Sequence, residues 1–149
     1  MPIHRFLLAV DNTQSSEREL QYVAEMLTAR EDIELYLLHI YPDPPPDYYS
    51  KGGTISDYTT ECEKQAATIF KGCLTRLSKS IDFQHITTAS INAEGRPLSD
   101  IILEKQQEYR CNTVVLGKRG ISKEEEFLFG SVSNSVVRSS HDFAVWIIS

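Results

Sequence analysis

Hydrophobic positions along the chain follow two spacings in turn, one typical of buried strands and the other of helices with a single buried face. Apolar or β-branched runs predict five strands, over residues 3–10, 33–40, 83–91, 113–116 and 143–148. Between them, apolar side chains recur three or four positions apart, which predicts helices after residue 16, over 57–80, from Pro97 onward and after Gly130. Parallel neighbours in a sheet need crossover helices. The pattern therefore predicts an α/β fold, a doubly wound, Rossmann-like, five-stranded parallel sheet with helices on both faces.

One long segment follows neither spacing and lies between Tyr41 and Gly53. Its prolines remove backbone donors and its glycines favour turns, so we expect a surface loop. Tyr48 and Tyr49 in this loop could cover a ligand, face a partner or be ordinary exposed side chains, and the sequence leaves these alternatives open. The length of 149 residues is that of one compact domain, so residues 1–149 are expected to form a single domain.

Composition narrows the class of partner. The formal net charge of -6 and the lack of a Lys or Arg run argue against binding to nucleic acid. No apolar run approaches the ~20 residues that span a membrane, and the three cysteines (Cys62, Cys73, Cys111) form no Cys-x-x-Cys pair. We expect buried thiols in a reducing cytoplasm, with no nucleic-acid or membrane partner. The histidines are scattered, so no metal site is expected.

Candidate binding residues fall at the predicted carboxyl ends of three strands. Asp11 follows the first strand, Ile40 ends the second, and Gly117 follows the fourth. Open α/β sheets bind their ligands outside these strand ends, so the three residues are expected to share one site.

The segment from Gly117 onward carries glycines at a distinctive spacing. Gly120 follows after two residues, and Gly130 with Ser131 after nine more. Gly117 and Gly120 would permit unusual φ values and a close approach to a ligand, while Gly130, Ser131 and Ser133 would bring free N–H groups and hydroxyls to a helix N-terminus. A lone Gly-x-x-Gly more often only turns the chain. The longer spacing, between a strand and a helix, favours a phosphate-binding loop.

On these motifs the sequence resembles the universal stress protein family. The spacing Gly-x2-Gly-x9-Gly-Ser is similar to that of the family's ATP-binding branch, and the opening Leu-Ala-Val-Asp-Asn-Thr is similar to its Val-Asp-Gly-Ser start. Leu37-Leu38-His39-Ile40 is similar to its second strand. The resemblance covers nearly the whole chain in order.

The resemblance implies an adenine nucleotide alpha hydrolase-like fold that holds ATP, with or without Mg²⁺, across the strand ends. It places Asp11 by the ribose or adenine and the backbone of Ile40 against the adenine. The remaining nucleotide-binding residues that it implies surround the phosphates: Gly117, Gly120, Gly130, Ser131, Val132 and Ser133.

Two departures from the family pattern affect this site. Asn12-Thr13 replaces the commoner Gly-Ser after Asp11, which is expected to tighten the first loop. Three acidic residues inside the glycine loop would oppose phosphate binding if they faced the ligand, although a solvated helical turn is the favoured interpretation. These residues are Glu124, Glu125 and Glu126.

The favoured function is a nucleotide-dependent signalling or interaction module in stress response, with no catalytic residue and at most slow ATP hydrolysis. Two alternatives stay open: a slow enzyme for phosphoryl or adenylyl transfer with Asp11 as its base, and a dimeric scaffold that has lost its nucleotide. The resemblance also implies a homodimer. The last predicted strand, which begins at Phe143 and ends at Ile148, would pair with its copy if it lay at the sheet edge; a monomer with a protected edge is the alternative.

Overall fold

Five parallel strands form the centre of the molecule in the computed structural model, which describes residues 2–117 and 131–149. In chain order they are β1 (His4–Ala9), β2 (Ile33–Tyr41), β3 (Ile86–Asn92), β4 (Thr113–Gly117) and β5 (Ala144–Ile148). Their order across the sheet is β3-β2-β1-β4-β5, which leaves β3 and β5 at the two edges. The predicted doubly wound parallel sheet is confirmed.

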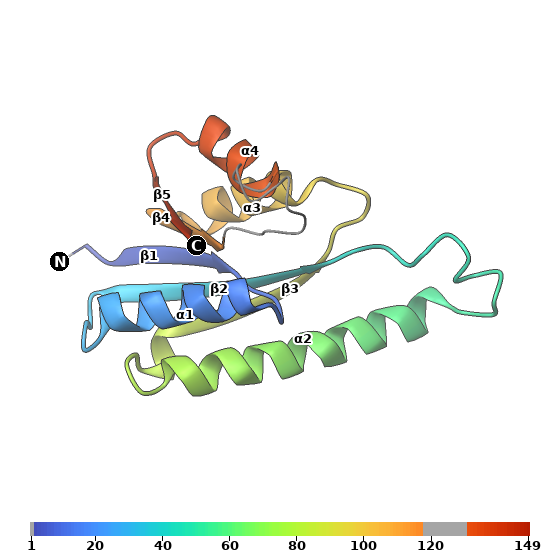
Figure 1. Ribbon diagram of the computed structural model, residues 1–149, viewed down its shortest axis with the longest axis horizontal. Helices are drawn as coiled ribbons and strands as arrows, with labels where there is room; N and C mark the ends of the chain where they lie inside the picture. The colour runs from blue at the N-terminus through green and yellow to red at the C-terminus, as the bar shows by residue number, and fades with distance from the viewer. Residues whose placement is uncertain (1, 118–130) are drawn as a thin grey trace.

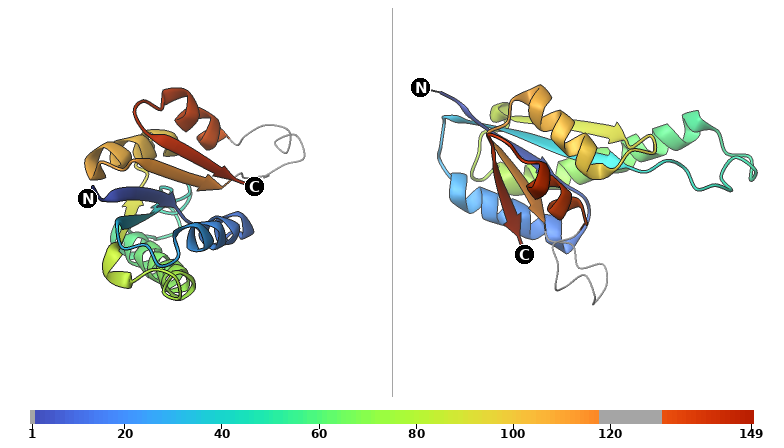
Figure 2. Two further views of the ribbon diagram at one scale, coloured as in Figure 1. Left: turned by 90° about the vertical axis from the view of Figure 1, so that its left-hand side faces the viewer. Right: turned by 90° about the horizontal axis from the view of Figure 1, so that it is seen from above.

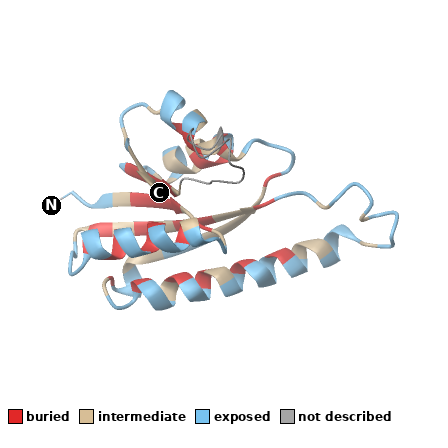
Figure 3. Cartoon of the chain, viewed as in Figure 1, coloured by how far each residue is buried: buried red, intermediate tan, exposed pale blue. Residues whose placement is uncertain are grey.

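In the described ranges, four α-helices cover the sheet in two layers. α1 (Gln14–Leu27) and α2 (Ile55–Leu77) lie on one face, and α3 (Leu98–Tyr109) and α4 (Ser131–Ser139) lie on the other (Figure 1). Alternate residues of a strand point to opposite faces, so the inner strands are apolar on both sides. Leu8 of β1 belongs to the core beneath α1 and α2, whereas its neighbour Leu7 belongs to the core beneath α3 and α4. Figure 3 shows the buried positions on both sides of the sheet.

Three predicted boundaries are wrong: the start of β3 and both ends of α2, which ends at Leu77 rather than at residue 80. Residues 83–85 form a 3₁₀ turn rather than the start of β3. Asp82 caps this turn by accepting from the Gln84 N–H at 3.0 Å, and Phe83 is 68% exposed rather than buried in a sheet. α2 begins two residues early, because the Thr54 side chain accepts from the Asp57 N–H and caps the helix at that point.

The loop after β2 and the first turns of α2 project well beyond the end of the sheet (Figures 1 and 2). The predicted surface loop is thus confirmed. It extends away from the sheet as an arm and does not fold back over it. α2 is the longest helix described, with 23 residues, yet neither it nor any other helix in the described ranges has an apolar stretch able to cross a membrane.

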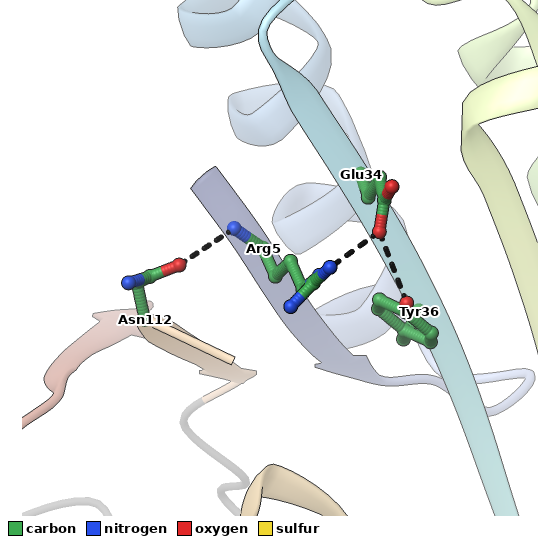
Figure 4. A network of polar contacts seen from close by, with 4 residues as sticks. All are labelled: Arg5, Glu34, Tyr36 and Asn112. Carbon is green, nitrogen blue, oxygen red and sulfur yellow. Dashed lines mark hydrogen bonds and ion pairs between the residues drawn. The ribbon is translucent and has the colours of Figure 1, made fainter. Parts of the chain in front are cut away.

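Polar contacts join the N-terminal ends of three neighbouring strands, β1, β2 and β4 (Figure 4). Arg5 of β1 donates its Nε–H to Glu34 Oε2 of β2 at 3.0 Å, and the Tyr36 hydroxyl donates to the same oxygen at 3.0 Å. The Arg5 backbone N–H donates to Asn112 Oδ1, just before β4, at 2.9 Å. These contacts hold β1 in register between β2 and β4, whose contacting residues follow Arg5 in the chain by 29 and 107 positions.

Candidate functional site at the switch in strand order

The strand order reverses at β1. From β1 the chain moves outward through β2 to β3, and it then returns to place β4 and β5 on the other side of β1. Ligands of open α/β sheets bind at this reversal, outside the carboxyl ends of the strands. Asp11 follows β1, Ile40 lies near the end of β2, and Gly117 ends β4. The fold therefore brings these three predicted residues to the carboxyl ends of three adjacent strands.

Asp11 is held in a tight turn by the start of α1. Its Oδ1 accepts from both the N–H and the hydroxyl of Thr13, and its own N–H donates to Ser16 Oγ at 3.0 Å. Thr13 is also the N-cap of α1, because its Oγ1 accepts from the Ser16 N–H. Thr13 thus closes the first loop and caps α1 with the same side chain.

The β1–β2 ladder ends just before Ile40. The last rung joins the Val10 N–H to the Leu38 carbonyl at 2.8 Å. The Val10 carbonyl then accepts from His39 Nδ1 at 2.9 Å, and because a carbonyl can only accept, Nδ1 carries the proton. In a parallel ladder the Val10 carbonyl would be the partner of the Ile40 N–H. Since the Tyr41 carbonyl accepts from the Ala93 N–H on the β3 side, the backbone groups of Ile40 point the other way, toward β1.

Gly117 is required by a close approach between β4 and α1. A Cβ at this position would overlap Ser15 Oγ and lie 3.3 Å from Ser15 Cβ and 3.4 Å from its carbonyl oxygen. The backbone does not have the positive φ that would itself demand glycine, so the predicted reason of unusual φ is wrong here. The Gly117 carbonyl accepts from the buried Ser133 hydroxyl at 3.4 Å, which ties the end of β4 to α4.

The remaining phosphate-loop residues are only partly described. Ser131 opens α4, and the half-buried Val132 packs against the core beneath α3 and α4. Gly120 and Gly130 lie outside the described residues, as does the acidic triplet of Glu124, Glu125 and Glu126. Their contacts with phosphate stay a prediction.

Sequence reasoning did not assign Thr13, Ser16 and His39 to the site, although they set the position of Asp11 and Ile40. A signal was present for Thr13, since threonine just before an amphipathic helix is a favoured N-cap residue. His39 gave no such signal, because its acceptor Val10 lies on another strand, 29 positions away.

Two of the three cysteines are held as neutral thiols by burial. All three are free and buried, as predicted. Burial raises the pKa of Cys73 to about 11, with the buried Glu19 carboxylate adding to the effect, and burial raises the pKa of Cys111 to about 12. Both thiols are therefore protonated at neutral pH. Across residues 2–117 and 131–149, no three His, Cys, Asp or Glu side chains gather as a metal site.

Comparison with known proteins agrees with this geometry. The model of the universal stress protein family matches residues 2–147. The chain belongs to the universal stress protein family. A universal stress protein from Bacillus subtilis, YxiE, is 26% identical over 144 residues, covering 92% of this chain and 93% of that protein.

Solved universal stress proteins share the fold at lower identity. UspA from Lactobacillus plantarum is 16% identical with a TM-score of 0.76, covering 100% of this chain and 99% of that one. A universal stress protein in complex with cAMP is 18% identical (TM-score 0.65; 100% and 98% covered). One from Archaeoglobus fulgidus in complex with dAMP is 19% identical (TM-score 0.64; 100% of both chains covered).

Proposed function

We propose that this universal stress protein binds ATP at the switch in strand order and serves as a nucleotide-dependent interaction module in stress signalling. The observation that carries the proposal is the meeting of Asp11, the backbone of Ile40 and Gly117 at the ends of three adjacent strands. Relatives solved in complex with cAMP and with dAMP support an adenine nucleotide as the ligand class.

The described donors and acceptors fit the adenosine half of such a ligand. An N–H and a carbonyl directed toward the β1 side from Ile40 match the donor and acceptor pattern on the edge of adenine. The Asp11 carboxylate can accept from ribose hydroxyls, as acidic residues do in dinucleotide-binding folds. At the other side of the crevice, the N-terminus of α4 offers N–H groups and the positive end of a helix dipole to phosphate. Mg²⁺ would neutralise phosphate charge.

Nucleotide binding can be tested in two steps. The purified protein is denatured and the released small molecules are identified. The nucleotide-free protein is then titrated with ATP, ADP and AMP, with and without Mg²⁺. We expect ATP to bind without appreciable turnover. No binding at millimolar nucleotide would contradict the proposal and favour a scaffold, whereas steady Mg²⁺-dependent turnover would favour an enzyme.

A matched pair of variants locates the site. Asp11→Asn keeps an oxygen that can accept from Thr13 but removes the negative charge. Losing a hydrogen bond to a charged group costs about 1.5–3 kcal/mol, so the Kd for ATP should rise roughly ten- to a hundredfold. Asp100→Asn, at an exposed position in the first turn of α3, is the control and should leave the Kd unchanged.

The proposed mode of action is a shift in population between two surfaces. A ligand changes a protein's conformation only by binding one form better than the other. ATP that joins the ends of β1, β2 and β4 to the start of α4 would favour the form in which these elements are held together. That form would then be recognised by a protein partner in the cytoplasm.

We also propose that the protein is a homodimer joined through β5. This strand lies at the sheet edge, and its side chains from Val145 to Ile148 are half-buried rather than charged. An edge strand of this kind is stabilised when a second strand covers it. A two-fold axis at β5 would supply that strand from an identical chain.

A further inference from the structure

The arm, defined as residues 42–54, has a composition that nucleotide binding does not explain. Four of the chain's six prolines lie in it, and three are consecutive. Pro45 and Pro46 are followed by Asp47 and Tyr48, and the first three of these residues are exposed. The arm projects beyond the end of the sheet together with the first turns of α2, so this Pro-Pro-Asp-Tyr sequence is presented at a distance from the sheet (Figures 1 and 2).

Tyr48 holds the arm in a closed form. Its ring lies on Gly53 so closely that a Cβ on that glycine would overlap three ring atoms. Its hydroxyl donates to the Thr54 carbonyl at 3.0 Å, and its ring centre lies 5.4 Å from that of Tyr58. The Tyr58 hydroxyl in turn donates to the Pro42 carbonyl at the base of the arm. The side chains of Tyr48 and Tyr58 therefore hold the two ends of the arm, at Thr54 and at Pro42.

The backbone of the Pro-Pro-Asp-Tyr sequence is a turn in this closed form. The Tyr48 N–H donates to the Pro45 carbonyl at 2.9 Å, four residues in the pattern of a β-turn with Pro46 at its second position. Proline is favoured there because its ring fixes φ at the value the turn needs. The same four residues in an extended chain would instead adopt a polyproline II conformation.

We propose that the arm is a ligand for a WW-type domain and that the contacts of Tyr48 and Tyr58 keep this ligand closed. WW domains bind extended prolines in an aromatic-lined groove, and those that read Pro-Pro-x-Tyr take the tyrosine ring into a separate pocket. The three residues that this motif specifies are present at its spacing, as Pro45, Pro46 and Tyr48. SH3 domains, which use a similar groove, read prolines beside a basic residue, whereas Asp43 and Asp47 flank these prolines.

Closure has a measurable consequence for affinity. Binding requires the turn to open and Tyr48 to leave Gly53 and Tyr58. When only a fraction of molecules is open, the apparent Kd equals the intrinsic Kd divided by that fraction. A change that loosens the closed form without altering the Pro-Pro-Asp-Tyr sequence should therefore tighten binding.

Titration calorimetry of the full chain with an isolated WW domain of known Pro-Pro-x-Tyr preference tests this directly. Wild type should bind weakly. Tyr58→Ala removes the ring beside Tyr48 and the bond to Pro42, and it should lower the Kd about threefold or more. Tyr48→Ala removes the side chain that the domain reads and should abolish binding. Phe83→Ala, at an exposed aromatic side chain in the 3₁₀ turn that follows the far end of α2, is the control and should bind as wild type does.

Circular dichroism and urea unfolding of each variant establish that the sheet remains folded. Failure of the folded Tyr58→Ala protein to bind the WW domain would overturn the proposal. So would undiminished binding by Tyr48→Ala, or stronger binding to an SH3 domain used as comparator. Equal Kd values for wild type and Tyr58→Ala would overturn the inference that the contacts of Tyr58 keep the arm closed. None of these outcomes depends on whether ATP binds.

Discussion

At the scale of single residues, Gly117 shows how the fold constrains the site. Adding one methyl group by Gly117→Ala would force Ser15, and with it the start of α1, away from the end of β4. Overpacking of this kind costs about 1–3 kcal/mol. We expect the free energy of unfolding, measured in urea without nucleotide, to fall by that amount.

A second variant distinguishes overpacking from other effects of the substitution. Ser15→Ala removes the hydroxyl that the new methyl group would meet, although the Ser15 Cβ and carbonyl remain nearby. In the double variant Gly117→Ala/Ser15→Ala, part of the lost stability should return relative to the sum of the two single changes. Strict additivity of the two losses would show that Ser15 is not the obstacle.

At the scale of elements, the Arg5–Glu34 pair joins β1 to β2 and predicts a dependence on pH. The hydrogen bond from Arg5 lowers the pKa of Glu34 below its ordinary value of 4.5. A carboxylate with a lowered pKa in the folded state stabilises the protein above its unfolded pKa and loses that contribution as pH falls through the folded value. The stability that Glu34 adds should therefore be complete at pH 7 and should fade below about pH 4.5.

Comparison of wild type with Glu34→Gln isolates this contribution, since glutamine keeps the shape and one acceptor. The difference in urea midpoint between the two proteins should be largest at pH 7 and should shrink as pH drops below 4.5. Glu61→Gln, on the exposed surface of α2, is the control and should change the midpoint little at any of these pH values. A difference for Glu34→Gln that grows on acidification would contradict the assignment.

Two glycines outside the crevice predict opposite effects of the same substitution. A Cβ on either Gly72 or Gly52 would meet no atom within 4 Å, but only Gly52 has a positive φ, of 90°. Gly72→Ala, at an exposed position in the C-terminal third of α2, should stabilise the protein by ~0.5–1 kcal/mol, because alanine loses less entropy in a helix. Gly52→Ala should destabilise it, because L side chains rarely adopt that backbone conformation. Thermal unfolding of the two variants should therefore shift in opposite directions.

The order of elements followed from hydrophobic spacing because burial on one or both sides of a strand or helix leaves a local record in the sequence. Hydrophobic spacing gave the wrong start for β3 at Phe83, because the sequence alone does not distinguish an exposed aromatic residue in a capped turn from a buried one in a strand. Asp11 was assignable because strand ends meet at one edge of a parallel sheet. The close approach of Ser15 to Gly117 and the hydrogen bond from His39 to the Val10 carbonyl could not be predicted, because each contact joins residues that are far apart in the sequence.

At the scale of the whole molecule, the two edges of the sheet differ in character. β3 presents the exposed Thr87 and Thr88, whereas β5 presents half-buried apolar residues. Trp146 of β5 packs 5.3 Å from the ring centre of Phe6 and 5.9 Å from that of Tyr22. Tyr22 is itself 40% exposed, so an apolar margin continues from β5 onto α1. This asymmetry favours association through β5 rather than through β3.

A lysine placed on each edge tests this asymmetry. Lysine on an edge strand discourages pairing, because joining two such strands would bring like charges together and desolvate them. Val145→Lys should therefore change the mass measured by light scattering from twice the chain mass of 16.9 kDa to that of one chain. Thr87→Lys places the same charge on β3 and should leave the dimer intact.

Because association depends on concentration, both variants are compared with wild type over the same micromolar range, with circular dichroism as a check on folding. A wild type that stays at the mass of one chain throughout, or a dimer lost in Thr87→Lys but kept in Val145→Lys, would rule out β5 as the interface.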